Sequence, residues 1–199
     1  MSTGTFSGTP KTEWLTSAVS PDRDMKLLEN FSYEDPSGRK WLAPVNSVIN
    51  GASIPIALWS TVGSPYTGDY RCASIVHDVA CDDPTVIRKE ADKMFYFACL
   101  AGGCSQGQAR MLYVGVRIGS WSLSPFHLPH YYNTELSLNL PGVLPDNTVL
   151  IQDKFTRVLS RVNEERGDLT FEELEGIVDE QLENPAGPLI SKPPAVIGQ

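Results

Sequence analysis

Hydrophobic and polar residues follow two different periods along this chain. In the first 50 residues, short runs of aromatic and β-branched residues are separated by turn signals such as SPDRD and DPSG, which predicts β-strands and a hairpin. Residues 51–68 are interrupted by glycine and proline and are expected to form a loop. Apolar residues at helical spacing then predict helices over about 69–81, 86–101 and 106–119.

The pattern changes after Trp121, where proline, polar and aromatic residues replace the helical periodicity. Amphipathic helices are expected again over about 149–163 and 170–183, the second opened by a capping box of Thr170 and Glu173. The predicted organisation is a β-plus-helical domain at 1–121, an extended wrapping segment at 122–150, two amphipathic helices at 151–184 and a proline-rich tail at 185–199. The expected fold class is α+β, with a small N-terminal antiparallel β-sheet packed on a helix hairpin and further helices, and an extended C-terminal arm.

Charge and hydropathy narrow the classes of partner. The 199 residues carry a net charge of −8, and the longest basic cluster is the pair Arg39-Lys40, so nucleic-acid binding is disfavoured. No apolar run approaches the roughly 18 residues that a membrane-spanning helix needs. The start of the sequence, MSTGTFSGTPKTEW, lacks the pattern of a secretory signal peptide.

The stretch CASIVHDVACDD places His77 and Asp78 side by side in an apolar run. His77 shares one helix face with small apolar residues at 73, 76 and 80, so its imidazole is expected to be buried. Asp78 points about 100° away, towards the edge of that face.

Asp92, on the next predicted helix, is the expected partner of His77. A short loop makes the two helices an antiparallel hairpin, and both residues lie at a similar depth, roughly 6 Å and 9 Å from the loop at 1.5 Å per residue. A carboxylate there would fix the tautomer of the imidazole, which is the base-plus-orienter arrangement of a hydrolase. Two simpler interpretations are a satisfied core histidine and a surface Arg88–Asp92 ion pair.

The residue types in this region suggest two kinds of metal site. Asp78, with backbone carbonyls from the glycine-containing loop 51–68, suits Ca²⁺. A structural zinc site would use His77 and Cys81, but it lacks two well-spaced further ligands. The four cysteines otherwise fit small buried thiols, and Cys72 is expected to approach Cys99 at the open end of the hairpin.

The segments FSY, GASIP, GDYRCASIVHD, RKEADKMF and MLYVGVRIG resemble, in order and spacing, a family found in phages and prophages, the domain of unknown function 1353. The resemblance covers about residues 6–121 and implies a phage origin but no activity. The sequence departs from the family pattern at Asn50, where an aspartate is usual, and at Cys81, where a tyrosine is usual.

CASIVHDVACD, followed by a helix bearing Asp92, is also similar to the catalytic helix pair of phospholipase A(2) enzymes. That resemblance implies His77 as the base that activates water, Asp92 as its orienter and Asp78 as a Ca²⁺ ligand. It also implies a calcium loop around Gly63 and Gly68, and phospholipid as a partner.

Two further functions remain open. One is a non-catalytic structural or assembly protein of a phage particle, which the extended segment and tail favour. The other is a different hydrolase, such as a peptidoglycan-directed enzyme, with Ser53 or Cys72 as nucleophile. His127 and His130 are expected at the surface or in packing. The expected location is the host cytoplasm or the phage particle.

Overall fold

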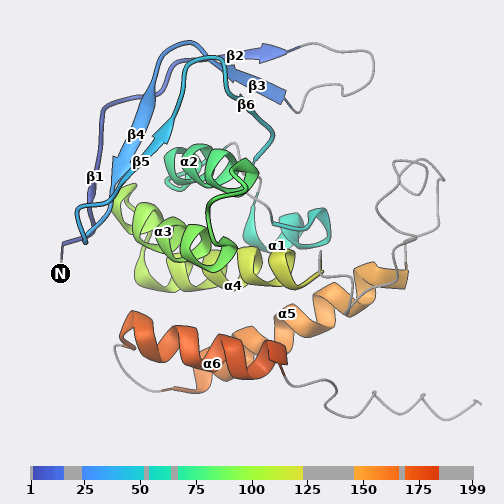
Figure 1. Ribbon diagram of the computed structural model, residues 1–199. Helices are drawn as coiled ribbons and strands as arrows, with labels where there is room; N and C mark the ends of the chain where they lie inside the picture. Colours follow the sequence, from blue (N-terminus) through green and yellow to red (C-terminus); the bar gives the residue numbers. More distant parts are fainter. Residues whose placement is uncertain are drawn as a thin grey trace, which may run out of the picture.

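The computed structural model describes residues 2–15, 24–51, 54–63, 67–122, 146–165 and 169–183. Two small β-sheets pack against one side of a layer of helices, and a second pair of helices lies on the opposite side of that layer (Figure 1). The fold is therefore α+β, as predicted, with the strands N-terminal to the main helices.

The strands are short and antiparallel. They are β1 (Thr5–Phe6), β2 (Thr12–Leu15), β3 (Asp24–Leu27), β4 (Phe31–Glu34), β5 (Lys40–Ala43) and β6 (Val48–Ile49). They form two three-stranded sheets, in the orders β1-β4-β5 and β2-β3-β6. The single N-terminal sheet expected from the sequence is thus divided in two, because bends after β3 and β5 interrupt the apolar runs that contain them.

The DPSG turn joins β4 to β5, as predicted. Oδ1 of Asp35 accepts hydrogen bonds from the backbone N–H groups of Ser37 and Arg39, at 2.8 and 3.1 Å. Gly38 has a φ of 86°, a left-handed conformation that glycine adopts without steric cost. These contacts fix the register that pairs Tyr33 with Trp41.

The helices are η1 (Ile56–Leu58), α1 (Trp59–Val62), α2 (Arg71–Asp82), α3 (Arg88–Ala101), α4 (Gln106–Ser122), α5 (Asp146–Glu164) and α6 (Phe171–Glu183). The prediction of a loop over 51–68 is wrong for η1 and α1. Glycines and prolines flank this segment, but Leu58 and Val62 are spaced to enter the core, and their burial stabilises two short helical turns.

The hairpin of α2 and α3 is confirmed and lies between the sheets and α4 (Figure 1). Its two helices bury their apolar faces against each other, with Val76 on α2 and Phe95 on α3 both buried. Residues from the strands, including Phe31 and Tyr33, complete the same core on the other side. His77 and Asp92 therefore sit in the interior of the domain and not at its surface.

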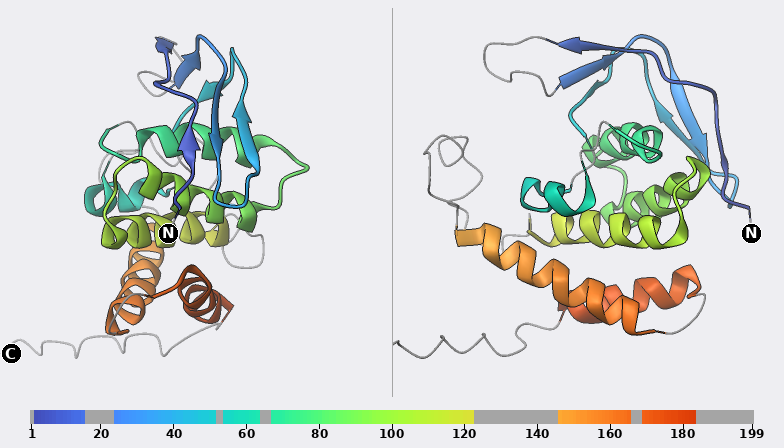
Figure 2. Two further views of the ribbon diagram at one scale, coloured as in Figure 1. Left: turned by 90° about the vertical axis from the view of Figure 1, so that its left-hand side faces the viewer. Right: turned by 180° about the vertical axis from the view of Figure 1, so that it is seen from behind.

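Helices α5 and α6 lie on the side of α4 that faces away from the sheets (Figure 2). The predicted capping box is present: the backbone N–H of Thr170 donates to Glu173 at 2.8 Å, and the N–H of Glu173 donates to Oγ1 of Thr170 at 3.3 Å. Helix α5 begins at Asp146, inside the segment expected to be extended. The rest of that expectation, over 123–145, and the predicted proline-rich tail at 185–199 lie outside the described residues. No helix in the described ranges is long and apolar enough to cross a membrane.

Candidate functional site: a buried histidine–aspartate pair

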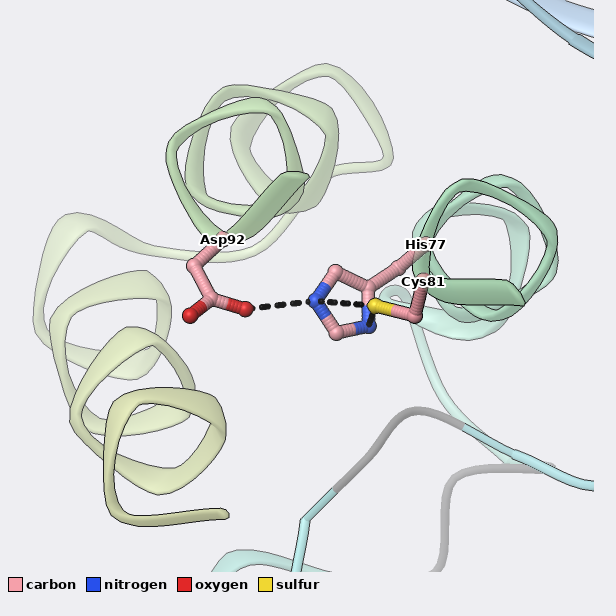
Figure 3. Close-up of side chains that lie close together, drawn as sticks. All are labelled: His77, Cys81 and Asp92. Carbon is pink, nitrogen blue, oxygen red and sulfur yellow. Dashed lines mark hydrogen bonds and ion pairs between the residues drawn. The ribbon is translucent and has the colours of Figure 1, made fainter. Parts of the chain in front are cut away.

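The imidazole of His77 and the carboxylate of Asp92 face each other across the α2–α3 hairpin (Figure 3). Nε2 of His77 lies 2.8 Å from Oδ1 of Asp92, and both side chains are fully buried. The expected contact between the two residues is confirmed. The expected Arg88–Asp92 ion pair is present, with 3.8 Å between Nε and Oδ1, but its expected place on a solvated face is wrong, because the Asp92 side chain has no exposed area.

Apolar packing determines where the imidazole lies. Helix α2 turns the small residues Ala73 and Ala80 and the buried Val76 towards the core, and His77 shares that face. The ring packs against Phe95 of α3, with 4.8 Å between the ring centroids. This packing leaves the ring edge as the part of the imidazole that meets Asp92.

Two further groups compensate the buried carboxylate of Asp92. Oγ of Ser120, on α4, donates to Oδ2 at 2.8 Å. Nε of Arg88 lies 3.8 Å from Oδ1 and donates to Oγ of Ser120 at 3.2 Å. A buried carboxylate is costly unless it is paired and hydrogen-bonded, and these contacts supply both conditions.

The 2.8 Å distance alone does not say which group donates, so we assign the direction of this hydrogen bond, and with it the tautomer of His77, from the chemistry of a carboxylate. An ionised carboxylate can only accept, so Nε2–H of the neutral imidazole donates to Asp92. The lone pair is then left on Nδ1, on the opposite side of the ring. A histidine held in this way has an oriented basic nitrogen, which is the chemical property a general base needs.

The thiol of Cys81 is the other group beside this ring. Its sulfur lies 3.5 Å from Nε2 and 3.7 Å from Nδ1 of His77. A sulfur in the ring plane at such equal distances would collide with Cε1, so it lies over the face of the imidazole (Figure 3). The lone pair of Nδ1 lies in the ring plane, and Cys81 is therefore not placed as a nucleophile activated by His77.

Asp78 has different neighbours from His77 and ties α2 to the chain that follows β6. Its Oδ2 accepts the backbone N–H groups of Asn50 and Gly51, at 2.8 and 2.7 Å. Burial raises the pKa of this carboxyl to about 7, while the two N–H donors act in the opposite direction. Asp78 also lines a small cavity together with Met25, Ile49, Gly51, Arg71, Ser74 and Ile75.

The groups around Asp78 do not form an oxygen-rich cation site within the described residues. The two groups that contact Oδ2 of Asp78 are N–H donors, whereas Ca²⁺ binds oxygen ligands, and Arg71 brings a positive charge to the same cavity. Gly63 and Gly68 both lie against the ring of Tyr70 and are not part of that cavity. The calcium role of Asp78, Gly63 and Gly68 stays a prediction, and the chemistry proposed below includes no step through calcium.

The other candidate residues fall in less reactive surroundings or outside the described chain. Burial raises the pKa of the Cys72 thiol, so it is a weak nucleophile. The thiol of Cys99 pairs with that of Cys104, and the expected approach of Cys72 to Cys99 stays a prediction. All four cysteines are free thiols. Ser53, His127 and His130 lie outside the described residues.

Sequence reasoning missed Ser120. It lies near the end of α4, whose residues Leu112, Val116 and Gly119 are buried against the hairpin layer. A polar residue at the edge of such an apolar face is a weak signal, because serine in a helix often bonds only its own backbone. Besides its contact with Asp92, Ser120 makes such a backbone contact too, with the carbonyl of Val116 at 3.1 Å.

Comparison with known proteins places the chain in a family. Residues 25–116 match the family described as "Protein of unknown function (DUF1353)". Over 172 aligned residues, the chain is 30% identical to the uncharacterized protein y4iH of Sinorhizobium fredii (strain NBRC 101917 / NGR234), covering 80% of this chain and 72% of that protein. The chain belongs to the DUF1353 family. It is also 34% identical over 113 residues to the uncharacterized protein y4jT of the same organism, covering 57% of this chain and 33% of y4jT.

The part that matches the DUF1353 family contains the whole α2–α3 hairpin, and with it His77, Cys81 and Asp92. Ser120 and the helices α5 and α6 lie beyond it. No solved structure matches the chain. None of the matches described above is named as a phospholipase, so the similarity to phospholipase A(2) rests on the hairpin residues alone.

Proposed function

We propose that this DUF1353 protein is an ester hydrolase in which His77 is the general base and Asp92 its positioning residue. The observation that carries the proposal is the 2.8 Å contact between Nε2 of His77 and Oδ1 of Asp92, with Ser120 on the other carboxylate oxygen. Such a contact keeps the proton on Nε2 and the lone pair on Nδ1. It also stabilises the imidazolium that forms when Nδ1 takes up a proton.

The reaction is a direct attack of water on the ester. Nδ1 of His77 removes a proton from water as the water oxygen bonds to the carbonyl carbon. The bond between that carbon and the alcohol oxygen then breaks, and the imidazolium returns the proton to the departing alkoxide. The products are a carboxylic acid and an alcohol, and His77 is left neutral as it began.

Phospholipid, or a related ester at a membrane surface, is the proposed substrate class. The support is the local likeness of the hairpin to phospholipase A(2), in which a histidine and a facing aspartate perform this chemistry. A phage or prophage origin fits such an activity, since a phage protein gains from breaching a membrane.

A second function, a non-catalytic assembly protein of a phage particle, is favoured by a different observation. His77 and Asp92 have no exposed side-chain area, so a substrate would reach Nδ1 only after the domain opens locally. In a structural protein the same pair is a satisfied polar contact in the core, which stabilises one packing of α2 on α3.

Ester release from mixed phospholipid vesicles, with calcium and with chelator, separates the two functions. We expect wild type to release fatty acid and His77→Gln to release none while remaining folded. Val76→Ala, a core truncation one residue away on α2, is the matched control: it should lose stability but keep activity per folded molecule. Absence of release by folded wild type at every calcium concentration would leave the assembly function standing.

A further inference from the structure

Three potential metal ligands of different chemical type converge at the α2–α3 hairpin. One ligand atom each from His77, Cys81 and Asp92 lie within 4.8 Å of one another. The first two are four residues apart on α2 and so lie on the same helix face, and the third comes from α3. Sequence alone offered only the pair of His77 and Cys81.

We propose that this cluster binds a thiophilic divalent cation, with Zn²⁺ as the physiological type, through Nε2 of His77, Oδ1 of Asp92 and Sγ of Cys81. This binding does not depend on the proposed hydrolysis. The metal takes the place of the proton that His77 and Asp92 share, and a water molecule completes a tetrahedral set.

The distances suit such a set after small movements. Bonds of about 2.0–2.3 Å in a tetrahedron separate neighbouring ligand atoms by roughly 3.2–3.6 Å. Nε2 and Sγ are already 3.5 Å apart. Nε2 and Oδ1, at 2.8 Å, need to separate slightly, and a rotation about the Cα–Cβ bond of Cys81 brings its sulfur from the ring face towards the metal. Cys81 is half-exposed, which gives the ion a route in.

Charge selects the type of metal. One thiolate and one carboxylate neutralise a divalent cation, which is the requirement for a site that is otherwise buried. A sulfur and an imidazole nitrogen are soft or intermediate ligands that suit Zn²⁺ and Co²⁺, whereas Ca²⁺ and Mg²⁺ require oxygen. Arg88, whose Nε lies 3.8 Å from Oδ1 of Asp92, opposes the cation, but its side chain is 30% exposed and can turn towards solvent.

Metal binding also has a consequence for the proton on His77. The neutral imidazole keeps one N–H, so coordination through Nε2 moves this proton to Nδ1. The thiol of Cys81 loses its proton to solvent, and one proton is therefore released for each metal bound. With Nδ1 protonated, His77 has no lone pair left to act as a base. If the protein is a hydrolase, Zn²⁺ is its inhibitor.

Titration of the full-length reduced protein with Co²⁺, followed by absorption spectroscopy, tests the site. We expect thiolate-to-cobalt charge transfer, the strong visible bands of tetrahedral Co²⁺, and their loss when Zn²⁺ is added. Cys81→Ser should remove the charge-transfer band, and Asp92→Asn should weaken binding at least about 10-fold. Cys72→Ser is the matched control, since Cys72 is also a half-exposed thiol on α2, and it should bind as wild type does.

A second measurement uses wild type alone, so it does not depend on whether the variants fold. In wild type, Zn²⁺ should slow alkylation of Cys81 and leave that of Cys72 unchanged, as read by peptide mass spectrometry. The proposal is overturned if folded wild type shows no charge-transfer band and no protection of Cys81, or if Cys72→Ser abolishes the band. These readouts involve no substrate, so they stand whether or not the protein hydrolyses esters.

Discussion

Nε2 of His77 and Oδ1 of Asp92 lie 2.8 Å apart although 15 residues separate them in the chain. The contact is the inner end of a polar chain that continues through Ser120 to Arg88 and joins α2, α3 and α4. Arg88 reaches solvent while His77 does not, so the chain connects the domain surface to a buried base.

Asp92→Asn should lower the free energy of unfolding by about 1.5–3 kcal/mol, because it removes the charge from a buried hydrogen bond to His77. Urea denaturation measures the change. Asp153→Asn is the control, since Asp153 pairs with Arg157 at 2.8 Å and the two side chains are 34% and 37% exposed, and its loss should be below about 1 kcal/mol. Equal losses in the two variants would mean that the pair with His77 has no special weight in the fold.

Ser120→Ala tests the positioning of Asp92. The hydroxyl contributes one hydrogen bond to Oδ2, so we expect a loss of about 1 kcal/mol in stability and a shift of the His77 ring resonances. Ser122→Ala, two residues further along α4, is the control. Among the described residues, the hydroxyl of Ser122 donates only to the carbonyl of Gly119, at 2.8 Å. It should leave the His77 resonances in place. Identical spectra for both variants would show that Ser120 does not position Asp92.

The sequence was informative wherever periodicity and short-range geometry decide the structure. The apolar register of His77 and the length of the loop to α3 sufficed to place His77 opposite Asp92. The helical spacing in α4 and the capping box at Thr170 were equally direct.

The remaining features depend on tertiary contacts that no local pattern encodes. The segment that contains Leu58 and Val62 forms helical turns because both side chains are buried in the core. Asp78 is tied to the N–H groups of Asn50 and Gly51, 28 and 27 residues earlier, and its neighbours were therefore not foreseeable from α2 alone. The position of Cys81 over the imidazole face follows from a side-chain rotation that a spacing of four does not determine.

Asp78 should make stability depend on pH. Burial raises the pKa of its carboxyl from the usual 3.8 to about 7, so between these values the folded state holds a proton that the unfolded chain lacks. The stabilisation that this proton gives to the folded state is fully present below about pH 4. It is lost as the pH rises towards 7, and the loss in the free energy of unfolding is on the order of a few kcal/mol. Urea denaturation from pH 4.5 to 7.5 should show the decline in wild type and a flatter profile in Asp78→Asn.

The matched control for that profile is Asp83→Asn. Hydrogen bonds from Thr85 lower the pKa of Asp83, so the contribution of Asp83 to stability changes with pH only in the acidic range where a carboxyl ordinarily titrates and below it. The Asp83→Asn variant should therefore show the same dependence of stability on pH above 4.5 as wild type. A wild-type profile that rises from pH 4.5 to 7, or an Asp78→Asn profile parallel to wild type, would contradict the assignment of this pH dependence to Asp78.

Nitrogen-15 NMR of the histidine rings, at neutral pH without metal, measures which nitrogen of the His77 imidazole carries the proton. We expect an unprotonated Nδ1 and a proton on Nε2 that exchanges slowly with solvent, because the contact to Asp92 is fully buried. Asp92→Asn should speed the exchange of that proton. A proton on Nδ1 of wild-type His77, alone or together with one on Nε2, would contradict the role of His77 as general base, since the nitrogen proposed as the base would then have no lone pair.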